Sequence, residues 1–111
     1  MLQNPSNYLF VHIEDGAPVG YLLAYRLDCF TQDASIVYLD DITVSPTYRQ
    51  RGIGRGLIGE LKRLIADTDS AEIWVGTSVD NEAAQALFAS TGARNISVRY
   101  IEFLYRQDSF A

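Results

Sequence analysis

Glycines and arginines are concentrated in one stretch in the middle of the chain: Tyr48-Arg49-Gln50-Arg51-Gly52-Ile53-Gly54-Arg55-Gly56. Glycine lets the backbone approach a ligand closely and leaves its N–H groups accessible. Apolar residues recur at helical spacing just after this stretch, and a helix N-terminus presents unpaired N–H donors with partial positive charge. Neighbouring arginines would add charge-assisted hydrogen bonds. The stretch therefore predicts a binding site for phosphate.

Two common phosphate motifs do not fit this loop. The dinucleotide fingerprint G-x-G-x-x-G would need a glycine where the chain has Leu57, and the chain contains no G-K-[ST] triplet. The alternative interpretation is that the glycines only allow tight packing of the helix against a strand.

Two adjacent carboxylates, Asp40 and Asp41, precede the loop on a predicted strand. Side chains alternate between the two faces of a strand, so we expect one of the two to face a substrate. A carboxylate in that position could act as a general base or attract a cation. The alternative is that either residue only solvates the surface of the sheet.

The elements that position these residues follow from periodicity and turn signals. Residues 8–13, 19–27 and 35–44 read as strands, with Asp15-Gly16 as the turn of a hairpin. Apolar residues at helical spacing predict a helix over 53–66, followed by a strand over 72–77 with Trp74 in the core. A second helix, capped by Asp80 or Asn81, should end at Gly92, and 96–105 should form a final strand. This order predicts an α/β (α+β) domain with a mixed sheet.

Bulk composition narrows the function classes. The chain has 111 residues, which suggests one domain over 1–111, and its net charge of −5 disfavours nucleic acid and suits a cationic substrate. The single cysteine, Cys29, and the single histidine, His12, cannot build a disulfide framework or a Cys/His metal cluster. Since there is no long apolar run and no signal-peptide pattern, we expect a cytoplasmic protein with no membrane association.

Three motifs in order resemble the GNAT superfamily of N-acetyltransferases. Arg49, Gly52 and Gly54 match the family's R/Q-x-x-G-x-G/A motif, and residues 41–48 resemble the strand that leads into it. The pattern Asn81-x-x-Ala84-x-x-Leu87-Phe88-x-x-x-Gly92 is similar to the second cofactor-side motif. The resemblance covers about residues 8–105 and is nearest to the aminoglycoside 3-N-acetyltransferases. It implies a GNAT-like mixed, mostly antiparallel sheet with two main helices, shortened at the N-terminus, where only residues 1–7 precede the first strand.

The resemblance also implies acetyl-CoA as cosubstrate, with no metal. Its pantetheine arm would pair with the backbone of the approach strand at Ile42, Thr43 and Val44. Its pyrophosphate would lie in the loop formed by Arg49, Gln50, Arg51, Gly52, Ile53, Gly54, Arg55 and Gly56, with N–H donors from Arg51, Gly52, Gly54, Arg55 and Gly56. Asn81 would reach the pantetheine or a phosphate, and Ala84 and Phe88 would pack on the cofactor.

The implied reaction is direct acetyl transfer to a primary amine, with a cationic small molecule (aminoglycoside or polyamine-like) as acceptor. Asp41 is the first candidate for the base and Asp40 the second, and the Val44 N–H is the candidate oxyanion donor. Phe88 stands where relatives often carry a proton-donating tyrosine, so the general acid stays open between water and another tyrosine such as Tyr100 or Tyr105. The alternatives are a protein or peptide amine as acceptor, or a CoA-binding module without turnover. We also expect a homodimer, in which a partner subunit could cover the acceptor side.

Overall fold

The computed structural model describes residues 6–28, 34–97 and 101–109, so Cys29 and Tyr100 lie outside the described residues. Strands β1 (Asn7–Glu14) and β2 (Ala17–Asp28) form the predicted hairpin. Asp15 and Gly16 connect them with φ values of 53° and 77°, the left-handed pair that a tight two-residue hairpin turn requires. Strand β3 (Ser35–Val44) then pairs with β2 in antiparallel orientation.

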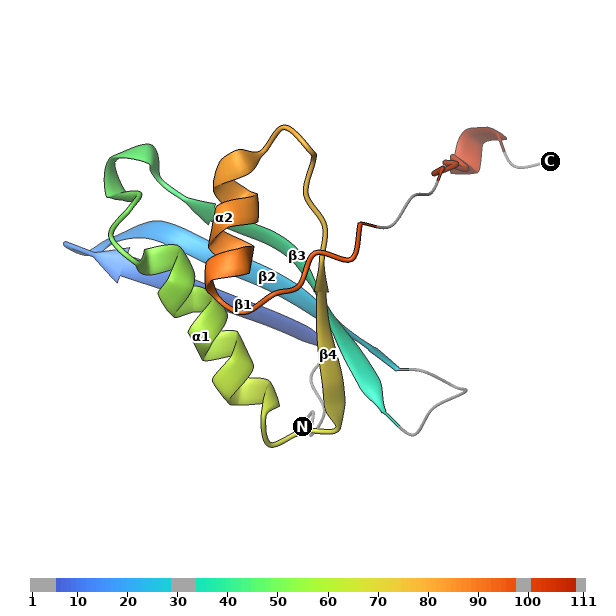
Figure 1. Ribbon diagram of the computed structural model, residues 1–111, viewed down its shortest axis with the longest axis horizontal. Helices are drawn as coiled ribbons and strands as arrows, with labels where there is room; N and C mark the ends of the chain where they lie inside the picture. Colours follow the sequence, from blue (N-terminus) through green and yellow to red (C-terminus); the bar gives the residue numbers. More distant parts are fainter. Residues whose placement is uncertain (1–5, 29–33, 98–100, 110–111) are drawn as a thin grey trace.

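A crossover through helix α1 (Ile53–Ile65) leads to strand β4 (Ser70–Val75), which pairs with β3 in parallel. The sheet order is β1-β2-β3-β4, and helix α2 (Glu82–Ser90) follows β4. Short 3₁₀ turns occupy Pro46–Tyr48 and Gln107–Ser109. The expected mixed, mostly antiparallel sheet with two main helices is therefore confirmed (Figure 1). Within the described residues neither helix has the length and apolarity needed to cross a membrane.

Both helices lie on the same face of the sheet (Figure 1). The apolar residues of α1 point into the core because they recur at the helical period. The core consists of the buried residues Tyr8, Val19, Leu22, Ala24, Val37, Leu39, Ile53, Leu57, Ile58, Leu61 and Ile65. Among the described residues no helix covers the opposite face of the sheet, which we call the uncovered face.

A β-bulge in β3 changes which side chains reach the uncovered face. Leu23 pairs with Asp41 but Ala24 pairs with Leu39, so Asp40 is an extra residue without a partner on β2. Leu39 is buried on the helix side, whereas Asp41 shares the uncovered face with its cross-strand partner Leu23. The bulge interrupts the simple alternation on which the expectation for the two aspartates rested.

Two sequence-based expectations are wrong. Ile96, Ser97 and the described residues of 101–105 are not in a strand; the segment leads away from the sheet (Figure 1), and its apolar side chains Ile101, Phe103, Leu104 and Tyr105 are exposed. A strand-forming composition yields a strand only where a neighbouring edge accepts its backbone hydrogen bonds. Trp74 is 42% exposed and not in the core, because alternation along β4 turns Ile73 and Val75 toward the helices and Trp74 toward the uncovered face.

Candidate active site

The end of β3 forms an open strand edge. The last pair between β3 and β4 is Leu39 with Val75, and β3 continues to Val44 without β4 beside it. The Ser45 N–H donates to the Val19 carbonyl oxygen at 2.8 Å, which makes Gly20 and Val44 a non-hydrogen-bonded pair in the antiparallel ladder. The N–H and C=O groups of Val44, and by the same alternation those of Ile42, therefore point away from β2 toward the open edge.

The glycine-rich loop delivers free donors to the start of α1. Gly52 occupies the N-cap position with φ 81°, a conformation that glycine adopts without steric cost. The first helical hydrogen bond runs from the Gly56 N–H to the Gly52 carbonyl oxygen at 2.9 Å. The N–H groups of Ile53, Gly54 and Arg55 precede that bond and have no acceptor within the helix. The Gly56 N–H was expected to donate to a pyrophosphate, but in the structure it donates to the Gly52 carbonyl oxygen within the helix.

Gly54 also has a packing role, which is the alternative interpretation of the glycines. A Cβ atom at this position would come within 3.2 Å of the Leu87 Cδ2 atom and 4.0 Å of the Ile42 Cδ1 atom. Glycine here therefore lets the N-terminus of α1, the end of β3 and α2 meet closely. At Gly52, by contrast, an added Cβ would meet no atom within 4 Å.

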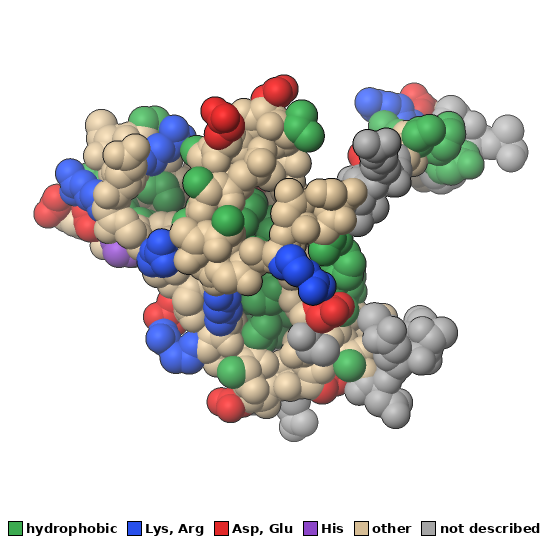
Figure 2. Space-filling model, viewed as in Figure 1, with side chains coloured by type: hydrophobic (Ala, Val, Ile, Leu, Met, Phe, Trp, Pro, Cys, Tyr) green, Lys and Arg blue, Asp and Glu red, His purple; other side chains and the backbone are tan. Residues whose placement is uncertain are grey.

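The basic residues around the loop have partners within the protein. The Arg49 Nε donates to the Val44 carbonyl oxygen at 3.0 Å, and an Arg55 nitrogen donates to the Ser90 carbonyl oxygen at 3.1 Å. Lys62 donates to the Thr91 carbonyl oxygen, so two cations of α1 meet the carbonyl end of α2. Figure 2 shows Lys and Arg side chains spread over the helix-bearing side and not gathered in one patch.

Arg51 is the basic side chain of the loop best placed to reach a ligand. It is 58% exposed, lies 3.8 Å from a Glu14 oxygen and stacks over the Tyr48 ring at 5.0 Å. An exposed ion pair of this length contributes little to stability. If Arg51 left Glu14 to bind a phosphate of a ligand, the loss of this ion pair would therefore cost little free energy.

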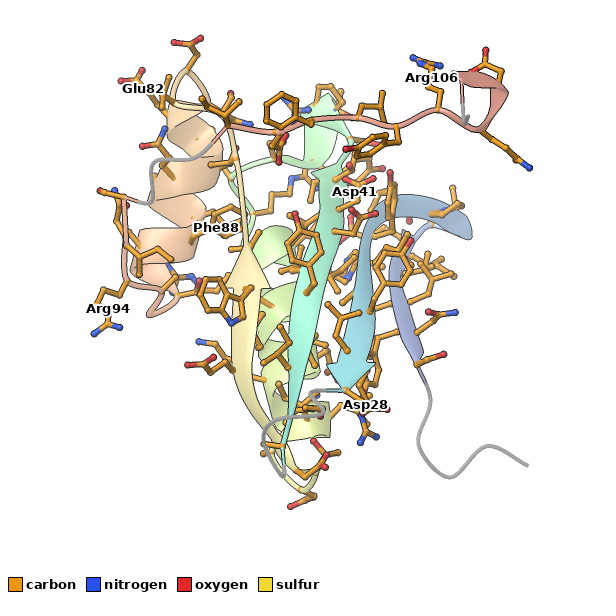
Figure 3. All side chains as sticks on the ribbon, turned by 90° about the vertical axis from the view of Figure 1, so that its right-hand side faces the viewer. Asp28, Asp41, Glu82, Phe88, Arg94 and Arg106 are labelled. Carbon is orange, nitrogen blue, oxygen red and sulfur yellow. The ribbon has the colours of Figure 1, made fainter. Side chains whose placement is uncertain are left out.

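Helix α2 borders the site through residues that also hold it in place. The Asn81 side chain caps the helix by accepting the Ala84 N–H at 3.0 Å, so Asn81 is the cap of the two candidates, Asp80 and Asn81, that the sequence offered. Ala84 is half-buried. Phe88 extends from α2 toward the sheet (Figure 3) and lines a cavity of about 300 Å³ together with Leu39 and Val75.

The structure separates the two candidate carboxylates. Asp41, labelled near the end of β3 in Figure 3, accepts the Tyr21 hydroxyl at Oδ2 (2.5 Å) and the Thr43 hydroxyl at Oδ1 (3.0 Å). Asp40 is exposed at the bulge, and none of its side-chain atoms has a hydrogen bond or ion pair to another described residue. Tyr21 was missed by the sequence analysis, because only the β2–β3 register, which pairs it with Thr43, brings it to Asp41.

The remaining tyrosine considered as a proton donor, Tyr105, lies outside the sheet. Tyr105 is exposed on the C-terminal segment that leads away from the sheet. The described residues therefore bring together Asp41, Tyr21, Thr43 and the open edge of β3, with the loop and α2 on the helix side.

Comparison with known proteins agrees with this geometry. The sequence matches the acetyltransferase (GNAT) family over residues 1–93. The L-2,4-diaminobutyric acid acetyltransferase of Nocardia farcinica is 32% identical over 80 residues, which make up 72% of this chain and 40% of that protein. The chain thus spans less than half of the length of this curated relative.

Solved structures share the fold. An aminoglycoside acetyltransferase from an uncultured soil metagenomic sample is 32% identical with a TM-score of 0.79, covering 94% of this chain and 70% of that chain. The aminoglycoside N-acetyltransferase AAC(6')-Iy, in complex with CoA, is 27% identical with a TM-score of 0.80, covering 94% and 79%. Aminoglycoside acetyltransferases are therefore among the structural neighbours, and the narrower likeness to 3-N-acetyltransferases stays a prediction.

Proposed function

Because the chain belongs to the GNAT family of acetyltransferases, we propose that it transfers an acetyl group from acetyl-CoA to a primary amine of a cationic small molecule. The observation that carries this proposal is the position of Asp41. Its carboxylate lies on the uncovered face, one residue from Ile42, whose backbone groups point to the open edge of β3. A base and an acyl-binding edge are thus adjacent.

Binding of acetyl-CoA is supported by the free N–H groups at the start of α1 and by the open edge of β3. Its pyrophosphate would accept the N–H groups of Gly52, Ile53, Gly54 and Arg55 at the start of α1, where the helix dipole favours an anion. Arg51 would add a charge-assisted hydrogen bond. The pantetheine arm would pair with the outward-facing backbone groups of β3, and α2 would flank it with the side chains of Asn81, Ala84 and Phe88.

The chemistry needs a base and an oxyanion donor. Asp41 removes a proton from the ammonium, and the freed amine nitrogen bonds to the thioester carbonyl carbon. The Val44 N–H points to the open edge and stabilises the oxyanion that forms. The carbon–sulfur bond then breaks, the nitrogen loses its second proton to water to give the neutral amide, and the CoA thiolate leaves and takes a proton. A thiol has a pKa of about 8.5 in its free state, so water can supply that proton without a tyrosine at the position of Phe88.

A cationic acceptor is supported by charge. The chain has a net charge of −5, and Asp40 and Asp41 both precede the loop. A protein or peptide amine is the second candidate, because no helix of the described residues covers the sheet at Asp41. A homodimer, in which a partner subunit covers this face, stays a prediction.

The proposal is tested by release of free CoA thiol from acetyl-CoA with a panel of small amines and peptides. We expect Asp41→Asn to lower kcat/KM by about 10²- to 10⁴-fold, because an amide cannot act as the base, while CoA affinity stays unchanged. Asp40→Asn is the matched control and should retain most activity.

Equal losses in the two aspartate variants would contradict the assignment of the base. Intact CoA binding with no thiol release for any amine would show a binding module instead of an enzyme. Thiol release with peptides but not with small amines would favour a protein or peptide amine as the acceptor.

A further inference from the structure

Two aromatic rings lie side by side on the uncovered face, and neither has a role in the proposed reaction. Tyr38 on β3 and Trp74 on β4 are paired in the parallel ladder. They are 39% and 42% exposed, although large aromatic side chains are usually buried for most of their area. Rings left open to solvent on adjacent strands offer a surface to a ligand.

These rings share their face with Asp41. Tyr38 is flanked in sequence by Val37 and Leu39, both buried on the helix side, so its own side chain points to the uncovered face. Tyr38 also pairs with Tyr25 on β2, two residues from Leu23, the partner of Asp41. The Tyr38–Trp74 pair and the Asp41 carboxylate therefore lie on one surface, about 7 Å apart along the sheet, which is the usual rise of the two residues that separate their partners Tyr25 and Leu23 on β2.

The chemistry of this surface suits positive charge. The Trp74 Nε1 donates to a Glu72 carboxylate oxygen at 3.1 Å, which orients the indole and places a second carboxylate beside it. Indole and phenol rings attract ammonium groups through their π faces, tryptophan most strongly. The outward-facing positions of the four strands hold no Lys or Arg to compete for the rings. These positions, among the described residues, include Asn7, Leu9, Val11, Ile13, Tyr21, Leu23, Tyr25, Leu27, Ile36, Tyr38, Asp41, Thr43, Glu72 and Trp74.

We propose that Tyr38 and Trp74 bind a second ammonium group of the acceptor, so that the preferred acceptor is an elongated diamine or polyamine. Its reacting nitrogen lies at Asp41, and its distant nitrogen lies on the two rings beside Glu72. This inference rests on the proposed acetyl transfer for the identity of the reacting nitrogen. It goes further in naming two specificity-determining residues and a spacing of about 7 Å between the nitrogens.

The test compares linear diamines of increasing chain length with monoamines of equal length, for the wild type and for Trp74→Leu, Trp74→Phe and Tyr38→Leu. The wild type should prefer the diamine, most strongly at a nitrogen separation of about 7 Å. Trp74→Leu and Tyr38→Leu should each raise KM for that diamine roughly two- to fivefold without lowering kcat. Trp74→Phe should fall between wild type and Trp74→Leu, because a phenyl ring keeps a weaker π face. Ile13→Ala, on the same face at β1, is the control and should change neither value.

KM values that rise equally for diamine and monoamine would overturn the inference, because the rings would then provide only apolar contact. Active enzyme without a preference for diamines would also overturn it and leave the proposed transfer intact. Trp74 is the single tryptophan of the chain, so its fluorescence reports binding without turnover. A diamine-specific change in emission that is lost in Tyr38→Leu would support the subsite even if no amine were acetylated; no such change in inactive protein would overturn both proposals.

Discussion

Gly52, at the N-cap position of α1, has a φ of 81° and open space where a Cβ would lie. Its requirement for glycine is conformational, because other residues pay about 1–2 kcal/mol in the left-handed region. Gly54, two residues later, is constrained by the Leu87 side chain 3.2 Å from a notional Cβ. One short motif thus contains a glycine for backbone geometry and a glycine for helix packing.

Substitution of Gly52 tests the conformational requirement for glycine at this position. Gly52→Ala should lower the free energy of unfolding by about 1 kcal/mol, since alanine is strained at positive φ. Gly59→Ala is the matched control: it lies inside α1 with no atom within 4 Å of a notional Cβ, and should raise stability by up to about 1 kcal/mol through helix propensity. Urea denaturation at unchanged m-value measures both, and a Gly52→Ala protein as stable as wild type would contradict the backbone argument.

At the scale of elements, α2 depends on contacts at its ends. It has nine residues and none of them is fully buried, and so short a helix is marginal by itself. Asn81 caps its first turn, while Arg55 and Lys62 of α1 donate to the carbonyl oxygens of Ser90 and Thr91. The position of α2 is therefore set by polar groups at both ends as well as by Leu87 and Phe88.

Removal of the N-cap should loosen this helix. Asn81→Ala leaves the Ala84 N–H without its acceptor, so we expect a loss of about 1 kcal/mol and faster amide hydrogen exchange across Glu82–Ser90. Asp80→Ala is the control, because the exposed Asp80 side chain has no hydrogen bond to another described residue. Equal exchange rates in the two variants would argue against the capping role.

At the scale of the whole molecule, the two faces of the sheet differ in kind. One face packs on α1 and α2 around an aliphatic core, and the other presents Asp41, Tyr38 and Trp74 to solvent. The loop at the start of α1 belongs to the helix side, and the open edge of β3 is where the two sides meet. In the proposed function, a cofactor and an acceptor would approach this one strand edge from different faces.

Ligand binding to the native state must stabilise the whole molecule. CoA at about 100 times its Kd should add about 2.7 kcal/mol, which raises the Tm on the order of 10 °C for a chain of this size. Pantetheine, which lacks the pyrophosphate, is the control and should raise the Tm much less at equal concentration. An equal rise in Tm with both ligands would contradict the proposal that the loop binds the pyrophosphate.

Local patterns in the sequence predicted most of the fold. The hairpin at Asp15-Gly16, the helix that begins at Ile53 and a cap at Asp80 or Asn81 were all predicted, because turn conformation, helical period and capping depend on neighbouring residues. The last strand was predicted wrongly, since a strand also requires a partner edge. The burial of Trp74 was predicted wrongly because a short apolar strand does not show whether both of its faces are covered.

The sequence by itself determined that this chain has a GNAT-type loop at a helix N-terminus, with Arg49, Gly52 and Gly54 at their positions, and two candidate carboxylates before it. Only the tertiary structure showed how the surroundings of those carboxylates differ. The bulge at Asp40 and the β2–β3 register turn Asp41 toward Tyr21 and Thr43 on the uncovered face. Register is a relation between strands far apart in the chain, and a shift of one residue would send each side chain to the other face.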